Sequence, residues 1–354
     1  MRRSIFLALI LLAITLPVTG QEQKAVNLLP LQVNDKFGYI DDRGKMVIAP
    51  QFDAALNFTE GLALVLIGED PMSGKWGFID ESGHYVIEPH LEMPITITSH
   101  YGFSEGLTAA PVNGKWGFID KTGNFVAPPQ FDRIENFSEG LAIAQQNDLF
   151  GFINHQGQFV IEPKFSHAEP FTEGLAAVAI NNKYGFIDQQ GNFVIAPQYD
   201  EAKSFSEGLA AVAFGKFPQD KWGFINASGQ LIIPPRFDDA KDFAGGLAAV
   251  EVNVETVSSG KEPGGWGFID RRGEFAIKPK YDEARSFSEG RAVVWIKGKG
   301  GYIDMTGRWI VRPRFNGSGN FTGGVASIWF GSCFEPKRQG YINRAGAFVW
   351  RPRN

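Results

Sequence analysis

Short apolar runs separated by polar turns, with a period of two, dominate this chain. In the stretch taken as a template, residues 175–180 are apolar throughout, residues 184–187 alternate between two faces, and residues 193–195 are apolar again. Runs of this length bounded by Asn, Asp and Gly are typical of β-strands. We therefore predict three strands that form a β meander. Beyond the N-terminal segment, no helical period is sustained over two turns.

The residues between these runs have the chemistry of tight turns. Asp188 can accept hydrogen bonds from backbone N–H groups further along the turn, and Gly191 supplies a positive φ. Pro197 ends the last strand because it has no N–H to donate. With period two, Tyr184 and Phe186 share one face, and the opposite face is also apolar. We expect the sheet to be covered on both sides, with each aromatic–glycine pair packing between successive units.

The template recurs nine times and decides the architecture. A glycine after the first aromatic marks each copy, with another glycine six residues later and a proline twelve residues later. A second element, Phe-Ser-Glu-Gly-Leu at 205–209, has a counterpart after each of the first eight marks. Units of this kind bury a core only by stacking. We predict one array over residues 21–354, with units marked by Gly38, Gly77, Gly117, Gly151, Gly185, Gly223, Gly267, Gly301 and Gly340.

These motifs resemble the bacterial WG-repeat (KWG-repeat) family. The resemblance rests on Lys-Trp-Gly-Phe-Ile-Asp at 75–80 and 115–120, with its later glycine, Val-Ile-x-Pro and Phe-Ser-Glu-Gly-Leu-Ala, and it covers about residues 28–354. It implies tandem β-repeats in bacterial, often exported proteins, and offers no catalytic residues. The chain departs from the pattern where Gly300 and Gln339 replace the aromatic.

Two shapes of the array are consistent with the repeat. We expect an all-β, open, superhelical and solenoid-like array of nine repeats of about 34 residues. The first unit has no upstream Phe-x-Glu-Gly element and the last two lose their aromatic, as capping units do. The alternative is a closed, propeller-like ring.

Residues 1–20 predict a secretory signal peptide. Arg2 and Arg3 precede an apolar run over 5–16 that is too short for a stable membrane span, and Val18-Thr19-Gly20 is a plausible cleavage site. The alternative is an uncleaved N-terminal anchor. No cysteine follows the run, so we expect no lipoprotein processing and place the mature chain in the periplasm or outside the cell. The single cysteine, Cys333, cannot form an intramolecular disulfide.

Charge is distributed unevenly along the chain. Residues 261–354 hold 17 Lys and Arg against 8 Asp and Glu, a net charge of +9, and residues 21–260 hold 15 against 31, a net charge of −16. Basic and aromatic side chains of the C-terminal part form a candidate binding surface for a protein or an anionic polysaccharide: Arg271, Arg272, Trp295, Arg308, Trp309, Arg312, Arg314, Trp329, Trp350 and Arg351. The alternatives are a solvated surface and, for the tryptophans, packing in the core. We expect no nucleic-acid partner, whereas self-association is left open.

Motifs for catalysis or for a cofactor are absent from the sequence. There is no Gly-x-Ser-x-Gly, no His-Glu-x-x-His and no phosphate-binding loop. His90, His100 and Glu92 make a metal site conceivable, but we favour scattered surface histidines as the explanation. The repeated turn acids, such as Asp188, are explained by turn capping without calcium. We therefore expect no catalytic residues, no cofactor and no metal.

Insertions gather at one hairpin of the repeat. The loops at 68–74, 215–220, 253–265 and 331–339 all lie between the same two predicted strands and would project from one edge. Such an edge is a binding surface in many repeat proteins, or it simply tolerates insertion. The sequence thus favours an exported, non-enzymatic binding or scaffold protein. The alternatives are a structural spacer or self-assembling envelope element that uses end-to-end contact, and then a hydrolase.

Overall fold

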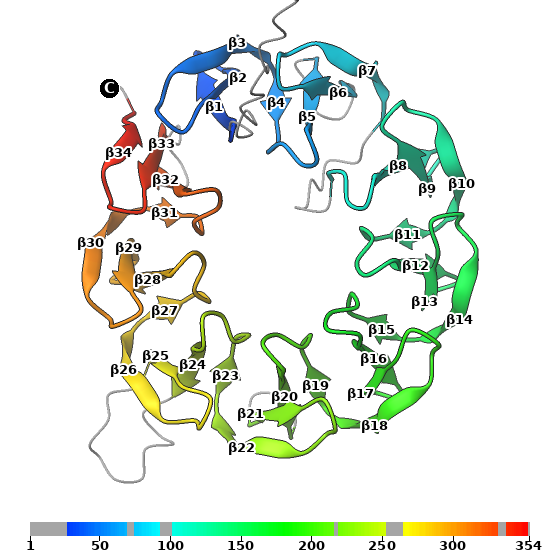
Figure 1. The fold of residues 1–354 in the computed structure, drawn as a ribbon, viewed down its shortest axis with the longest axis vertical. Coiled ribbons are helices and arrows are strands. Elements are labelled where there is room, and N and C mark those ends of the chain that lie inside the picture. Colours follow the sequence, from blue (N-terminus) through cyan, green and yellow to red (C-terminus); the bar gives the residue numbers. More distant parts are fainter. Residues whose placement is uncertain are drawn as a thin grey trace, which may run out of the picture.

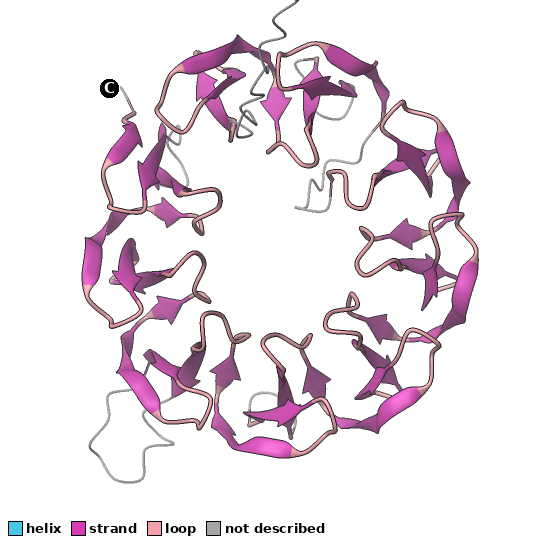
Figure 2. Ribbon diagram, in the orientation of Figure 1, coloured by secondary structure: helices cyan, strands magenta, loops and turns pink. Residues whose placement is uncertain are grey.

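The chain folds into nine small antiparallel sheets arranged as the blades of a closed ring (Figures 1 and 2). The computed structural model describes residues 27–68, 74–92, 101–215, 219–252, 265–331 and 338–352. Within these ranges every element is a strand, and no helix is long and apolar enough to cross a membrane. In a four-stranded blade we denote the strands A to D, from the middle of the ring outward (Figure 1).

The first five blades have the following strands. Blade 1 contains β1 (Leu29–Val33), β2 (Lys36–Ile40) and β3 (Met46–Phe52); blade 2 contains β4 (Ala54–Ala55), β5 (Leu62–Ile67), β6 (Lys75–Asp80) and β7 (Tyr85–Leu91); blade 3 contains β8 (Leu107–Val112), β9 (Lys115–Asp120) and β10 (Phe125–Phe131). Blade 4 contains β11 (Arg133–Ile134), β12 (Ala142–Gln146), β13 (Leu149–Ile153) and β14 (Phe159–Phe165); blade 5 contains β15 (His167–Ala168), β16 (Ala176–Ile180), β17 (Lys183–Ile187) and β18 (Phe193–Tyr199).

The remaining four blades are complete. Blade 6 contains β19 (Glu201–Ala202), β20 (Leu209–Phe214), β21 (Lys221–Asn226) and β22 (Leu231–Phe237); blade 7 contains β23 (Asp239–Ala240), β24 (Ala248–Val252), β25 (Gly265–Ile269) and β26 (Phe275–Tyr281). Blade 8 contains β27 (Glu283–Ala284), β28 (Arg291–Ile296), β29 (Lys299–Asp304) and β30 (Trp309–Phe315); blade 9 contains β31 (Gly317–Ser318), β32 (Val325–Phe330), β33 (Arg338–Asn343) and β34 (Phe348–Trp350). The predicted meander of strands B, C and D is confirmed, and the sequence missed the two-residue strand A.

Each blade buries its two faces against its two neighbours. In strand C of blade 5, Phe186 points toward blade 6 and packs on Phe205 of the next A–B loop, with ring centres 4.9 Å apart. Its neighbour Ile187 points the opposite way and joins the core shared with Phe152 of blade 4. The expectation of a sheet covered on both sides is therefore confirmed.

The glycine that marks each repeat has a role within its own blade. Opposite Gly185, strand D bulges, because Tyr184 pairs with Tyr199 whereas Phe186 pairs with Ile195. The bulge brings backbone so close that a Cβ on Gly185 would lie 2.5 Å from the Ile195 carbonyl oxygen. The prediction that this glycine packs between units is therefore wrong. Its missing side chain leaves space for the bulged outer strand of the same sheet.

One set of loops joins neighbouring blades on the face that carries the A–B loops and C–D turns. Glu173, which has a positive φ of 53°, accepts a hydrogen bond from the Gly208 N–H of the next A–B loop at 2.9 Å. The Ser138 hydroxyl donates to the Phe171 carbonyl of the next blade at 2.7 Å. The Phe-Ser-Glu-Gly element is thus a clasp that connects one blade to the next.

On the opposite face, an aspartate bridges the blades. Asp53 follows strand D of blade 1, and its Oδ1 lies 2.5 Å from the Lys36 Nζ of that blade. Its Oδ2 accepts from the Gly68 N–H of blade 2 at 3.0 Å. The lysine of the Lys-Trp-Gly motif and the aspartate of the Phe-Asp motif therefore meet at the boundary between two blades.

The ring closes where blade 9 packs on blade 1, without exchange of a strand (Figure 1). Leu29, Leu31 and Ile40 of blade 1 form a small buried cluster with Val325 and Tyr341 of blade 9. The clasp is built differently at this seam: Asn27 stands at the position of the glycine whose N–H donates to the preceding blade elsewhere, and here the Asn27 side-chain amide donates to the carbonyls of Thr322 and Gly323, each at 3.4 Å. A Cβ on Gly323 would lie 2.1 Å from Asn27 Nδ2, so a glutamate there would collide with the asparagine.

The degenerate end repeats are adapted members of the ring. Gly300 and Gln339, which replace the aromatic of strand C, pair across the sheet with Trp295 and Trp329 of strand B. In both blades the bulky aromatic side chain comes from strand B instead of strand C. The closed-ring alternative is therefore confirmed, and the open array is not what the chain forms. Because the two end blades contact each other, they are not free for the end-to-end contact that a spacer would use.

We predict that Gly185→Ala destabilises the ring by about 2–3 kcal/mol, because the added methyl group must displace the bulged strand. Denaturant unfolding monitored by tryptophan fluorescence measures the change. Gln190→Ala, at an exposed turn position of the same blade, is the control and should have no effect. An unchanged unfolding midpoint for Gly185→Ala would show that strand D does not need the glycine.

We predict that Asp53→Asn lowers the free energy of unfolding by about 1 kcal/mol at pH 7. The hydrogen bond from Lys36 holds the pKa of Asp53 below its usual value, helped by the Gly68 N–H and opposed by burial. A depressed native pKa adds stability that is present above the unfolded value, about 4, and is lost as the pH falls through the native value. The difference between Asp53→Asn and the native chain should therefore shrink below pH 4, whereas the exposed control Asp42→Asn should show none. A difference that does not change with pH would contradict a role for the charge.

Candidate functional surface

The ten residues predicted as a binding surface fall into three separate groups. Arg271, Arg272 and Arg308 lie in C–D turns of blades 7 and 8, on the face of the clasps. Arg312, Arg314 and Arg351 lie in or directly after the outermost strands of blades 8 and 9. The four tryptophans are half-buried between blades. The structure therefore does not bring the ten residues together into one patch.

The tryptophans contribute mainly to packing. Trp309 meets Tyr281 of the preceding blade edge to face, with ring centres 5.9 Å apart. Trp295 packs in the core between blades 8 and 9, and the Arg285 guanidinium lies 5.0 Å from its ring centre. Trp350 packs against the seam cluster. Trp329 lies beside Gly317, where a Cβ would be 3.1 Å from its ring. Of the two interpretations open for these side chains, the structure favours packing.

The arginines of the C–D turns have partners in the ring. Arg271 donates from its guanidinium to the Glu207 carbonyl of blade 6 at 2.5 Å, which ties one turn to the preceding clasp. Arg272 makes two hydrogen bonds to Asp270 at 3.0 and 3.1 Å. Burial raises the pKa of Asp270, but hydrogen bonds from the Glu274 N–H and from Arg272 together hold it below its usual value. The Arg308 side chain is exposed, and its backbone N–H donates to Asp304.

The repeated acids act within the fold. Asp188 accepts from the N–H groups of Gln190 and Asn192 at 3.0 and 2.9 Å, which is the turn capping expected from the sequence. These bonds lower the pKa of Asp188, the bond from Asn192 most of all. Within the described ranges, no three His, Cys, Asp or Glu side chains gather closely enough to hold a metal ion. His90 is exposed and bonds to the Glu88 carbonyl, whereas His100 lies outside the described residues.

A surface that the sequence revealed only in part runs around the outer rim. In strand D, the outermost strand of each blade, the described residues at positions 11 and 13 after each marking glycine are exposed on the outside of the ring. On blades 6 to 9 the described residues at these positions are exposed and, apart from Pro234, basic: Arg236, Lys278, Lys280, Arg312, Arg314 and Arg351. We call this set the basic rim. Arg236 was missed because it belongs to the acidic part of the chain, and counting from the marking glycine would have found it.

The basic rim ends in a cavity on blade 9. Arg314 and Arg351 approach the same ring: their guanidinium carbons lie 5.6 and 4.6 Å from the centre of Phe348. A cavity of about 310 Å³ lies here, lined by Phe330, Arg338, Phe348, Arg351 and Pro352. Stacking on an aromatic face restrains the planar guanidinium groups and leaves their N–H donors available at the edges. Such an arrangement suits a carboxylate, sulfate or phosphate group.

The ends of strands B and C that flank the insertion loops lie on the face opposite the clasps. The middle residues of these loops, including Cys333, lie outside the described residues. The expectation that they form a binding edge therefore stays a prediction.

Comparison with solved structures finds matches at low identity. Kluyveromyces lactis Hsv2 is 11% identical over 69% of this chain and 90% of its own, with a TM-score of 0.41. The dihydro-heme d1 dehydrogenase NirN is 13% identical over 82% of this chain and 73% of its own, with a TM-score of 0.48. This likeness is too distant to transfer a ligand or a reaction to the chain. No curated protein matches it.

A protein-family model described as a WG-containing repeat matches most of the chain. The matches cover residues 37–69, 76–116, 116–150, 150–184, 184–216, 222–253, 266–299 and 301–328. In the structure each of these windows begins in strand C of one blade and runs on to strand B of the next blade, or just past it, so the sequence unit spans two blades. The chain belongs to the WG-repeat family, and its nine repeats form the nine blades of a closed ring.

Proposed function

We propose that this protein is an exported, non-enzymatic binding scaffold that holds an anionic partner on its basic rim. The observation that carries the proposal is the regular placement of six exposed cations on the outward positions of blades 6 to 9. Lys278, Arg312 and Arg351 occupy the same strand position on three successive blades, and Lys280 and Arg314 repeat two residues further on. A partner with evenly spaced anions would contact several blades at once.

Only one part of the outer rim is basic. On blades 1 to 5 the corresponding positions hold Glu88, Glu162, His90 and Lys164 among uncharged residues, so no basic arc forms there. Positive potential therefore gathers on one side of a protein whose net charge is −5. A local field of this kind speeds the approach of an oppositely charged partner and weakens as salt increases.

The acidic side chains that a hydrolase would need for catalysis are explained here by structural roles. The repeated aspartates cap turns, and the clasp glutamates accept hydrogen bonds from the next blade, as Glu173 does from Gly208. These acids support the ring. Export rests on the signal peptide expected over residues 1–20, which lie outside the described part of the chain. Either an acidic protein or an anionic polysaccharide would provide the groups that the rim selects.

We predict that Arg314→Glu weakens binding to dextran sulfate, and to a polyglutamate peptide, about tenfold at 50 mM salt. The substitution inverts a charge that lies beside Arg351 over the Phe348 ring, and a tenfold change in affinity corresponds to about 1.4 kcal/mol. The double variant Arg314→Glu/Arg351→Glu should weaken binding further. Titration calorimetry at several salt concentrations measures both effects.

Lys164→Glu is the matched control. Lys164 occupies the same strand position in blade 4, and its Nζ lies 5.2 Å from the Phe165 ring centre, as Arg314 lies over Phe315 at 5.0 Å. This variant has the same charge change and should bind nearly as the native chain does. Equal losses for Lys164→Glu and Arg314→Glu would show a response to net charge and contradict the rim. Binding that is unaffected by salt would also contradict it.

A further inference from the structure

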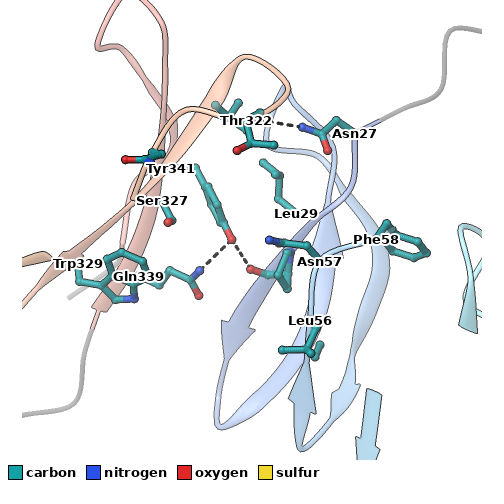
Figure 3. A pocket seen from close by; sticks show the side chains of 14 residues that line it. Asn27, Leu29, Leu56, Asn57, Phe58, Thr322, Ser327, Trp329, Gln339 and Tyr341 are labelled. Carbon is teal, nitrogen blue, oxygen red and sulfur yellow. Dashed lines mark hydrogen bonds between the residues drawn. The ribbon is translucent and has the colours of Figure 1, made fainter. Parts of the chain in front are cut away.

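A cavity of about 350 Å³ opens at the seam of the ring (Figure 3). Its walls come from three blades: Asn320, Ser327, Trp329, Gln339 and Tyr341 belong to blade 9, and Asn57 and Phe58 follow strand A of blade 2. Strand β1 of blade 1 forms the floor between them. The cavity therefore lies where the two ends of the ring meet.

The described elements that meet at the seam differ from those at the other interfaces. Elsewhere a blade presents strand A and the phenylalanine of its A–B loop to the preceding blade, as Ala202 and Phe205 of blade 6 do to Phe186. In blade 1 the first described strand is β1, which is a strand B. The counterparts of Ala202 and Phe205 at the seam would be residues 21 and 24, which lie outside the described residues. Tyr341, the counterpart of Phe186, faces this space.

The edge of β1 is closed against an added strand. Pro30 aligns with Ala211 of blade 6, whose carbonyl accepts a hydrogen bond from the N–H of Lys203 next to strand A. Proline has no N–H to offer, and the Tyr341 hydroxyl donates to the Pro30 carbonyl at 2.6 Å (Figure 3). Gln339 Nε2 in turn donates to the Tyr341 oxygen at 2.8 Å. These contacts block one end of the edge and disfavour β-strand addition.

The described part of the lining is polar and carries no charge. Among the described residues around the cavity none is Asp, Glu, Lys, Arg or His, and burial raises the pKa of Tyr341 far above neutral pH. The side-chain amides of Asn57 and Asn320 are exposed, and each offers two donors and an acceptor. Ser327 adds a hydroxyl, and the half-buried rings of Trp329 and Phe58 provide apolar faces.

We propose that the seam cavity binds a neutral saccharide. Sugar hydroxyls are both donors and acceptors, which amide and hydroxyl side chains match group by group. The C–H face of a sugar ring carries partial positive charge and packs on the negative face of an aromatic ring such as that of Trp329. The volume lies at the small end of ligand sites, which suits a short saccharide. A charged ligand would lose hydration without meeting an opposite charge.

This site is separate from the basic rim, and it can be tested separately. The native protein is titrated with glucose, galactose, mannose, N-acetylglucosamine and their disaccharides, and saturation-transfer NMR and tryptophan fluorescence follow binding. Glucuronate and glucosamine serve as charged counterparts. We expect at least one neutral sugar to bind and to raise the unfolding temperature, and its charged counterpart to bind at least tenfold more weakly.

Two variants locate the binding. Asn57→Ala and Asn320→Ala remove exposed amides from opposite walls, so both should fold normally, and together they should weaken sugar binding at least tenfold. Gln198→Ala removes an exposed amide from the outer strand of blade 5 and should leave binding unchanged. Binding that survives the double variant would overturn the proposal. A failure of every neutral sugar to bind would overturn it too.

A peptide spanning residues 199–208 tests the competing occupant. This peptide holds strand A and the A–B loop of blade 6, the elements that fill the corresponding space at another interface. We expect it not to bind, because Pro30 and Tyr341 close the edge of β1. A peptide that binds and is lost with the Asn57→Ala/Asn320→Ala variant would identify the cavity as a strand-docking slot and would refute a sugar site.

Discussion

Every blade of this protein depends on a neighbour on each side. Successive residues of strand C point to opposite blades, as Phe186 and Ile187 do, so a sheet with one neighbour would expose one of its apolar faces to water. An open array must cap its two ends with polar faces. This chain instead packs its ends on each other, and the cluster around Leu31 and Tyr341 removes both apolar faces from water at once. Ring closure is therefore the way in which the repeat satisfies its own packing requirement.

The seam shows how a repeat changes when its neighbour changes. Asn27 donates to blade 9, whereas the clasps elsewhere use a glutamate that accepts from the following blade. Trp295 and Trp329 supply from strand B the aromatic bulk that Gly300 and Gln339 no longer supply from strand C. In blades 8 and 9 the loss of the aromatic on strand C is matched by a tryptophan on strand B of the same blade, because a close-packed interface does not tolerate an isolated change in volume.

Structure and binding use different positions of the same unit. The inward residues of each strand pack between blades, and the turn and clasp acids tie the loops together, so these positions recur with few changes along the chain. The outward positions of strand D are exposed and vary from repeat to repeat, although some of them contact the next blade, as Arg314 contacts the Phe348 ring. Basic residues occupy them over blades 6 to 9, and the proposed scaffold function resides in that variation. The seam cavity is the one proposed site that depends on the closure of the ring.

The sequence by itself determined the repeat, the three longer strands, the turn chemistry and the all-β class, because these follow from local periodicity and from backbone preferences of Gly, Pro and Asp. It placed nine units and, within each unit, the positions that Gly185 and Asp188 occupy in the fifth. Only the tertiary structure decided that the array closes, because closure depends on contacts such as that between Asn27 and Thr322, 295 residues apart. The same holds for the roles of Trp295 and Trp329, since their partners lie on other strands and in other blades. Long-range packing leaves no signal in local spacing, which is why the ends of the chain looked like caps before their contact was seen.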